Sequence, residues 1–192
     1  ISFFLSLHAG AMKIPIWEIL FSFSEQGSKE SLVLWQIRVP RAVIAVILGA
    51  TLGLAGASMQ GLLRNPLAEP GILGVTGGAV LGAVLMLYTG LSHAFALALP
   101  MGGILGALLS VIALYLFSGW MPSTQTLILA GVALNTLAFA GTALALNLAP
   151  DAYSGLEIVF WQMGSLADRS LVHLKLLLPF VLAGWVLLAW DQ

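Results

Sequence analysis

The stretch Ala42–Leu63 reads AVIAVILGATLGLAGASMQGLL and contains no charged residue. A transmembrane α-helix needs about 20 mainly apolar residues to cross the hydrocarbon core of a bilayer, and this stretch is long enough. The whole chain is similar in character, since 60% of its 192 residues are apolar and only 8% are charged, whereas a soluble domain carries roughly 25% charged residues. Because so few charges cannot cover a water-facing surface, the sequence predicts an all-α fold, a polytopic bundle of transmembrane helices.

Further apolar windows follow along the chain, separated by turns rich in proline, glycine and asparagine. The predicted spans are residues 1–9 in part, 42–63, 72–90, 94–117, 127–148 and 172–190. The opening run begins inside apolar sequence, without a basic n-region or an obvious cleavage site, so we interpret it as the tail of a span; a signal-peptide core is the alternative. Both ends look cut, and we expect residues 1–192 to be one membrane domain, incomplete at both ends, with about five and a half spans.

Small residues recur at every fourth position in three of the predicted spans. The stripes are Ala45, Gly49, Gly53, Ala57 and Gly61 in the second span, Gly74, Gly78 and Gly82 in the third, and Gly102, Gly106 and Ser110 in the fourth. A spacing of four puts each stripe on one helix face, where neighbouring backbones can approach closely although no hydrophobic force drives association in lipid. We therefore predict that the second span packs through its stripe, from Gly49 to Gly61, inside the bundle.

Several classes of site are excluded by what the chain lacks. It has no cysteine, which rules out thiolate metal sites and cysteine nucleophiles. The three histidines lie in separate segments without metal-ligand spacing, and neither a GxSxG nor a GxxxxGK[ST] motif occurs. The net charge of −1 does not favour a nucleic-acid partner. We therefore predict no catalytic residue, no metal site and no enzymatic activity on this chain.

The segment Trp35–Arg41, WQIRVPR, puts two arginines at the mouth of the second span. Arg38 and Arg41 are three residues apart, and Pro40 restricts the backbone between them. They could anchor the span, with both side chains reaching the headgroups. They could instead grip carboxylates of a soluble partner, since a guanidinium binds a carboxylate through two hydrogen bonds. Composition alone favours anchoring.

The loop Arg64–Gly71, RNPLAEPG, joins the second and third predicted spans. Its candidate residues are Arg64, Asn65, Pro66, Glu69, Pro70 and Gly71. Each proline restricts its own backbone and the residue before it, so the loop is predicted to be a rigid turn. Such a turn can simply join two spans, or it can present its two charges to another chain. Counted over the loops present, lysines and arginines favour an orientation with this turn outside, but segments beyond both ends are missing from the count, so charge leaves the orientation open.

The fifth predicted span carries one amide, Asn135, in the otherwise apolar stretch LILAGVALNTLAFAGTALAL. It shares one helix face with Gly131, Ala138 and Thr142. Either a neighbouring helix satisfies this amide, or its face lies beside a translocation pathway.

The segment Leu156–Gly164, LEIVFWQMG, is largely apolar but too short to span a bilayer. As a helix it would measure about 13 Å, less than half of the hydrocarbon thickness. Such a piece lies at the membrane interface or forms a re-entrant half-helix that lines a cavity.

Taken together, four collinear segments resemble one family, the FecCD-type permeases. They are WQIRVPR from Trp35, GATLGLAGASMQGLLRNPLAEPGILGVTGGA from Gly49, LILAGVALN from Leu127 and FWQMGSL from Phe160. These permeases are the membrane subunits of binding-protein-dependent ABC importers for iron-siderophores, haem and cobalamin. The resemblance implies ten spans per complete subunit in a bacterial inner membrane, with this chain covering the end of span one through span six and its amino-terminal side in the cytoplasm.

The resemblance also implies partners. The family works as a dimer of permease subunits with two cytoplasmic ATPase subunits, which use the ATP, and an extracytoplasmic binding protein, so this chain is expected to hold no cofactor. Arg38 and Arg41 match the arginines that pair with acidic residues on the lobes of the binding protein, which reverses the preference for anchoring. The family's main ATPase-contacting loop follows span six, beyond Gln192.

For the pathway, the resemblance places the fifth span with Asn135, and the half-helix with Trp161 and Met163, at the dimer interface. The residues near the cytoplasmic gate would be Ser123, Thr124 and Gln125. No residue decides which chelate is carried.

Two other classes of function are the alternatives. A secondary transporter or channel would need ionisable residues within its spans, and the predicted spans hold almost none. A purely structural membrane scaffold would leave RNPLAEPG and WQIRVPR without a purpose.

Overall fold

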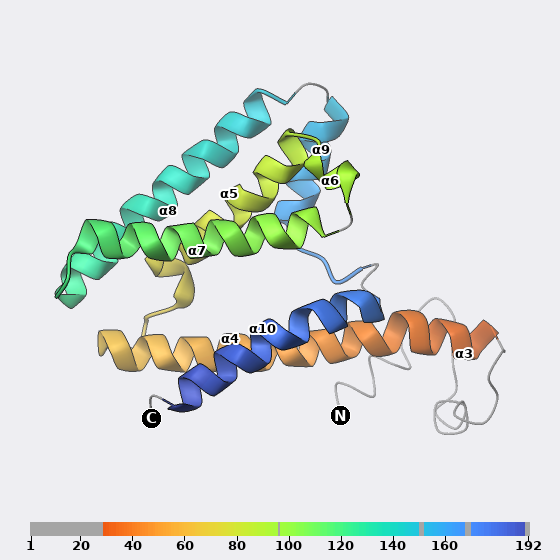
Figure 1. Cartoon of the computed structure of the whole chain (residues 1–192), viewed down its shortest axis with the longest axis horizontal. Helices are drawn as coiled ribbons and strands as arrows, with labels where there is room; N and C mark the ends of the chain where they lie inside the picture. The colour runs from red at the N-terminus through yellow and green to blue at the C-terminus, as the bar shows by residue number, and fades with distance from the viewer. Residues whose placement is uncertain (1–28, 96, 150–151, 168–169, 191–192) are drawn as a thin grey trace. The chain divides into compact units, whose positions relative to one another are not determined.

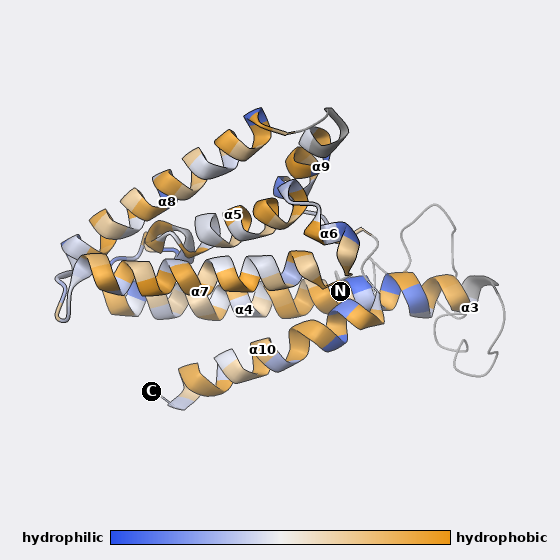
Figure 2. Ribbon diagram, turned by 45° about the horizontal axis from the view of Figure 1, so that its top comes forward, coloured by the Kyte–Doolittle hydropathy of each residue, from blue (hydrophilic) through white to orange (hydrophobic). Residues whose placement is uncertain are grey.

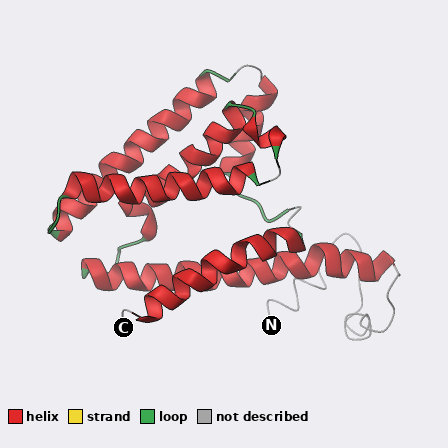
Figure 3. Ribbon diagram, viewed as in Figure 1, coloured by secondary structure: helices red, strands yellow, loops and turns green. Residues whose placement is uncertain are grey.

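A computed structural model of the chain describes residues 29–95, 97–149, 152–167 and 170–190. Every regular element in these ranges is a helix, so the prediction of an all-α fold is confirmed (Figure 3). The opening apolar run, residues 1–9, lies outside the described residues, and its span stays a prediction.

Four described helices are long and apolar enough to cross a membrane. They are the continuous helix Ser31–Leu63, α7 (Ala98–Ser118), α8 (Thr124–Asn147) and α10 (Leu171–Trp190). Figure 2 shows apolar residues along the length of α7, α8 and α10. Each of the four lies where a span was predicted, although the first begins earlier, because residues 31–41 continue the same helix.

The long first helix contains one turn of a different kind. It consists of α3 (Lys29–Val33), a π-helical turn η1 (Leu34–Arg38) and α4 (Val39–Leu63). The Val39 N–H donates to the Leu34 carbonyl oxygen, five residues earlier, instead of the usual four. Because Pro40 has no N–H and its ring presses on the carbonyl four residues before it, an α turn here would be strained. The wider π turn accommodates the proline without ending the helix.

The third predicted span, residues 72–90, is not one continuous helix. It consists of a 3₁₀ helix, η2 (Pro70–Leu73), and α5 (Val75–Tyr88), separated by Gly74. The φ angle of Gly74 is 79°, a left-handed conformation that glycine adopts without a steric penalty. With 14 residues, α5 is about 21 Å long and shorter than the hydrocarbon core. Hydropathy gave no sign of this break, because it does not detect a residue that needs a positive φ, and the span itself stays a prediction.

The chain divides into two compact units, residues 1–54 with 165–192, and residues 55–164. The interpretation of the whole chain as one domain stays a prediction. In the second unit α5 packs against both α7 and α8, and α6 (Leu91–Ala94) connects α5 to α7 (Figure 1).

Contacts between residues show the relative directions of α5, α7 and α8. Along α5, residues 78 and 82 meet residues 106 and 102 of α7, whereas residues 74 and 81 meet residues 131 and 141 of α8. Hence α5 is antiparallel to α7 and parallel to α8. The start of α5, the end of α7 and the start of α8 therefore share one end of the unit.

The small-residue stripes of the third and fourth spans pack on each other. An ideal Cβ built on Gly78 would lie 2.7 Å from the carbonyl oxygen of Gly106. One built on Gly102 would lie 2.7 Å from the carbonyl oxygen of Gly82. Both distances are shorter than a carbon–oxygen van der Waals contact, so the two backbones approach this closely only because these residues are glycines.

The stripe of the second span has no such neighbour. Within the part of the chain that the structure describes, an ideal Cβ on Gly49, Gly53 or Gly61 meets nothing within 4 Å. Gly49, Gly53, Ala57 and Gly61 are all exposed. Packing of α4 through this stripe, inside a bundle, stays a prediction.

Candidate functional site

The turn after α4 begins with a helix-ending motif built around Arg64. The Arg64 N–H donates to the Gly61 oxygen at 3.3 Å, and the Asn65 N–H donates to the Gln60 oxygen at 3.2 Å. This pair of bonds is the Schellman motif, in which the first residue past the helix is left-handed and is usually glycine. Here it is Arg64, whose φ is 46°. A left-handed conformation is strained for a residue with a Cβ, so the turn keeps a guanidinium where backbone geometry favours glycine.

Asn65 then fixes the tip of the turn. Its side-chain Oδ1 accepts the Leu67 N–H at 2.9 Å, and its backbone oxygen accepts the Ala68 N–H at 3.1 Å. Ala68 is only 3% exposed, whereas Leu67 is 82% exposed. These bonds close the turn, which presents the apolar side chain of Leu67 at its tip.

Glu69 ends the turn and starts the next helix. Its backbone is extended, Pro70 follows as the first residue of η2, and the Ile72 N–H donates to the Glu69 oxygen at 3.2 Å. The carboxylate oxygen Oε1 lies 3.3 Å from the position of a Cβ on Gly71. Arg64 and Glu69 are both exposed, so the turn can offer two opposite charges and one apolar tip to another molecule.

The residues predicted near the cytoplasmic gate begin α8. The Ser123 side-chain oxygen accepts the Thr126 N–H at 3.2 Å and lies 2.9 Å from the Thr126 hydroxyl, which makes Ser123 the N-cap. Thr124 and Gln125 follow in the first turn, and all three predicted residues are exposed. Because α5 and α8 are parallel, this cap lies at the same end of the second unit as the turn Arg64–Gly71.

Asn135 faces α5. Its Oδ1 lies against Gly77, its Cγ is 3.3 Å from the position of a Cβ there, and Oδ1 has no hydrogen-bond partner among the described residues. Gly131 and Ala138 of the same face are buried. The neighbouring helix thus packs on the amide without a hydrogen bond to its oxygen, and a pathway role for Asn135 stays a prediction.

The predicted half-helix is present as α9 (Ala152–Gln162). Its buried side holds Ile158, which is 0% exposed and packs with Val84 of α5. Trp161 is half-buried against this same cluster, whereas Met163 is 76% exposed. Trp161 therefore anchors α9, whereas Met163 is exposed, and a pathway role for either residue stays a prediction.

The predicted docking arginines lie on the long first helix, in the other unit. Arg38 is the last residue of the π turn and is half-buried, while Arg41 is exposed one turn later. The π turn itself was not predicted, although Pro40 is the signal that could have indicated it.

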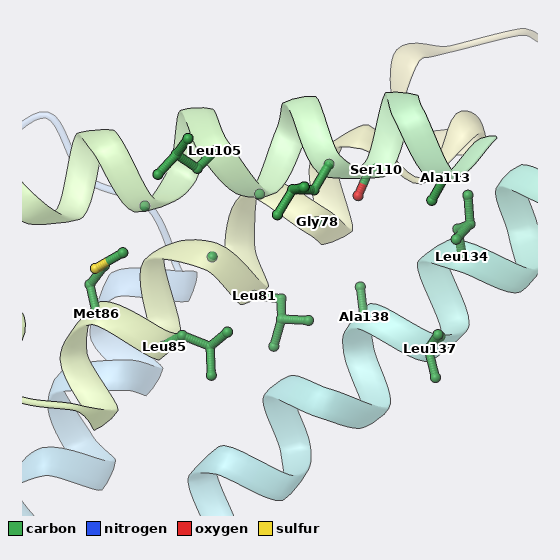
Figure 4. Close-up of a pocket in the computed structure, with 14 residues that line it drawn as sticks. Gly78, Leu81, Leu85, Met86, Leu105, Ser110, Ala113, Leu134, Leu137 and Ala138 are labelled. Atoms are coloured by element: carbon green, nitrogen blue, oxygen red, sulfur yellow. The ribbon is translucent and has the colours of Figure 1, made fainter. Parts of the chain in front are cut away.

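A groove of about 380 Å³ runs between α5, α7 and α8 (Figure 4). Its walls come from the glycine stripes of α5 and α7 and from leucines such as Leu105 and Leu137, and Ser110 provides its one polar side chain. Among the residues searched in the structure, no group of histidine or acidic residues could hold a metal ion.

Comparison with known proteins decides the family. The model of the FecCD transport family matches residues 1–191. This chain belongs to the FecCD transport family. Together with four helices that can cross a membrane, membership makes the chain a multi-pass membrane protein of a family of transport components.

Relatives of this FecCD chain are permease proteins. It is 41% identical to the ferric enterobactin transport system permease protein FepD of Escherichia coli, over 94% of this chain and 54% of that protein. It is 35% identical to the vitamin B12 import system permease protein BtuC of Klebsiella pneumoniae, over 98% of this chain and 55% of that protein. It is 38% identical to the uncharacterised ABC transporter permease protein YvrB of Bacillus subtilis, over 98% of this chain and 57% of that protein.

A solved structure shares the fold. It shows an inward-facing conformation of a transporter assigned to the metal-chelate ABC type, and it matches with a TM-score of 0.78 and 30% identity. The match covers 98% of this chain and 56% of that chain. This FecCD chain thus spans about half the length of the relatives that it matches.

Proposed function

We propose that this chain is part of the permease subunit of a binding-protein-dependent ABC importer. The observation that carries the proposal is the match to the FecCD family over residues 1–191. The cargo would be an iron-siderophore, haem or cobalamin-type chelate, in keeping with relatives named for ferric enterobactin and vitamin B12. The subunit would sit in the inner membrane of a bacterial cell.

Transport would proceed by alternating access between two permease copies. ATP binding and hydrolysis in two separate cytoplasmic ATPase subunits would rock the copies, and the chelate would pass between them without covalent chemistry on this chain. The scarcity of ionisable residues in the spans supports this, because a large ligand needs a wide pathway that binds it weakly.

Three surfaces would meet the partners. Arg38 and Arg41 would pair with carboxylates of the extracytoplasmic binding protein. The turn Arg64–Gly71 would face the cytoplasm and offer its charges to the ATPase side. Exposed Met163 would line the pathway, while the start of α8 at Ser123 would lie near the cytoplasmic gate.

The test is chelate uptake by vesicles that contain the transporter with its ATPase subunits and binding protein. We expect uptake to need ATP and to stop with an ATPase subunit that cannot hydrolyse it. Uptake that continues under those conditions, or that follows an ion gradient, would instead establish a secondary transporter or channel.

The docking surface is tested by charge reversal. Arg38→Glu with Arg41→Glu should weaken binding of the binding protein by at least about tenfold, because like charges then face each other. Reversal of Lys175, exposed near the start of α10, is the matched control. Unchanged affinity of the double variant would exclude this assignment.

A further inference from the structure

One close contact joins the region after the turn Arg64–Gly71 to α8. An ideal Cβ on Gly131 would lie 2.6 Å from the Leu73 Cα and 3.0 Å from the Leu73 carbonyl carbon. An ideal Cβ on Gly74 would lie 3.0 Å from the Gly131 oxygen and 3.2 Å from the Asn135 nitrogen. We call Leu73, Gly74, Gly77, Gly131 and Asn135 the joint. At Gly74 and Gly131 its two sides come into backbone contact, and at Gly77 the Asn135 side chain lies between them.

The joint also contains groups of opposite hydrogen-bonding type. The first backbone bond of α5 is donated by the Gly78 N–H to the Gly74 oxygen at 3.0 Å. The N–H groups of Val75, Thr76 and Gly77 precede it and have no acceptor within the helix. Asn135 Oδ1 is buried, lies against Gly77 and has no partner among the described residues. No hydrogen bond joins Asn135 Oδ1 to these N–H groups, so the amide contributes to the joint by packing against Gly77.

Both sides of the joint are tied closely to predicted cytoplasmic elements. On one side, Gly74 follows η2 directly, and η2 begins inside the turn at Pro70. On the other side, Gly131 lies eight residues after Ser123, about 12 Å along one helix. Helices and close-packed backbones shift between discrete arrangements and do not bend continuously. We therefore expect a displacement of the turn to displace the start of α8 by a similar amount.

We propose that the joint locks the turn Arg64–Gly71 to the gate residues Ser123–Gln125, so that the two move as one rigid body during transport. Asn135 is then a positioning residue and does not need to touch the cargo. The proposal rests on the proposed function, since it assigns the path by which movement on the ATPase side reaches the gate. It does not require a direct contact between gate and ATPase.

A distance measurement tests the rigid body directly. The chain has no cysteine, so Leu67→Cys and Gln125→Cys introduce two exposed positions for spin labels into the assembled transporter, with any cysteines of its other parts removed. We expect one narrow distance distribution that is the same without nucleotide and with ATP bound to a hydrolysis-deficient ATPase subunit. A shift of about one helical turn, roughly 5 Å, or a second population in either state would overturn the proposal.

Coupling gives the second test. In Gly131→Ala the new methyl meets backbone that must move, so the two sides of the joint are pushed apart. We expect the chelate transported per ATP hydrolysed to fall by about tenfold, because movement of the turn then no longer displaces the gate. Gly141→Ala, on the same helix, is the matched control, because its Cβ meets only the end of the Leu81 side chain, at 3.1 Å. Equal transport-to-ATP ratios in the two variants would overturn the proposal, even if Gly131→Ala is less stable.

The two tests separate this inference from the proposed function. If the unaltered transporter shows no ATP-dependent uptake, the proposed function fails, and the spin-label distance still shows whether turn and gate are rigidly joined. If uptake is ATP-dependent but the distance between the labels changes, the proposal of a rigid joint is rejected and the proposed importer function is retained.

Discussion

The glycine stripes of α5 and α7 and the stripe of α4 have the same four-residue spacing but different surroundings. Gly82 and Gly106 are in backbone contact with the opposite helix, whereas nothing described lies within 4 Å of a Cβ on Gly53. A four-residue spacing therefore permits two helices to approach closely, but it does not determine which helices pack together. Chain direction and loop length determine that, because the short connection at α6 brings α5 and α7 together.

The largest effect is expected where the contact is closest. Gly106→Ala should lower the free energy of unfolding by about 1–3 kcal/mol, because its Cβ would meet the Gly78 backbone. Gly103→Ala is the matched control on the same helix, since its Cβ meets only the Ala79 oxygen at 3.6 Å. Thermal unfolding of the detergent-solubilised transporter measures both. Similar melting temperatures for the two variants would mean that the α5–α7 contact is looser than described.

The contact between α5 and α8 adds a polar group to this kind of packing. Asn135→Leu should raise the free energy of unfolding by about 1–2 kcal/mol, because it replaces a buried oxygen that has no hydrogen-bond partner among the described residues with an apolar group of similar shape. Thr136→Leu, exposed one residue later on α8, is the control and should change stability little. The same unfolding assay applies. A less stable Asn135→Leu protein would show that the amide makes a favourable contact with α5 that the apolar side chain cannot replace.

The α4 stripe tests whether the same four-residue spacing always means that the glycines pack against another helix. If it packs as the sequence predicts, Gly53→Leu should weaken helix association by about 1 kcal/mol in the assembled transporter. Leu52→Ala, beside it and exposed, is the comparison. An unchanged or higher melting temperature for Gly53→Leu would show that this face of α4 contacts lipid.

The smallest effect concerns Arg64. Arg64→Gly should raise stability by about 0.5 kcal/mol, since relief of the left-handed strain slightly exceeds the entropy that glycine adds to the unfolded chain. If the turn contacts the ATPase side as we propose, uptake should fall at the same time, because the Arg64 guanidinium is lost. A variant that is more stable and equally active in uptake would show that Arg64 makes no contact with a partner that transport needs.

Local sequence patterns predict the positions of the helices more closely than the surroundings of individual side chains. Hydropathy predicted α7, α8 and α10 to within a few residues, because length and the absence of charge are enough to define a span. It missed the break at Gly74, since a positive φ leaves no trace in hydropathy, although the nearby Pro70-Gly71 pair indicated a turn. It also treated Trp161 and Met163 alike, and only packing against Ile158 shows that the tryptophan supports α9 while the methionine is exposed.

By itself the sequence determined that this chain is helical and membrane-embedded, and its motifs were enough to identify the family. Those properties depend on composition and on local spacing, which act along the chain. The tertiary structure decided which glycines meet a neighbouring backbone, which end of the second unit holds both the turn and the start of α8, and where Asn135 points. These depend on contacts between residues far apart in sequence, such as Gly74 with Gly131, which no local pattern specifies.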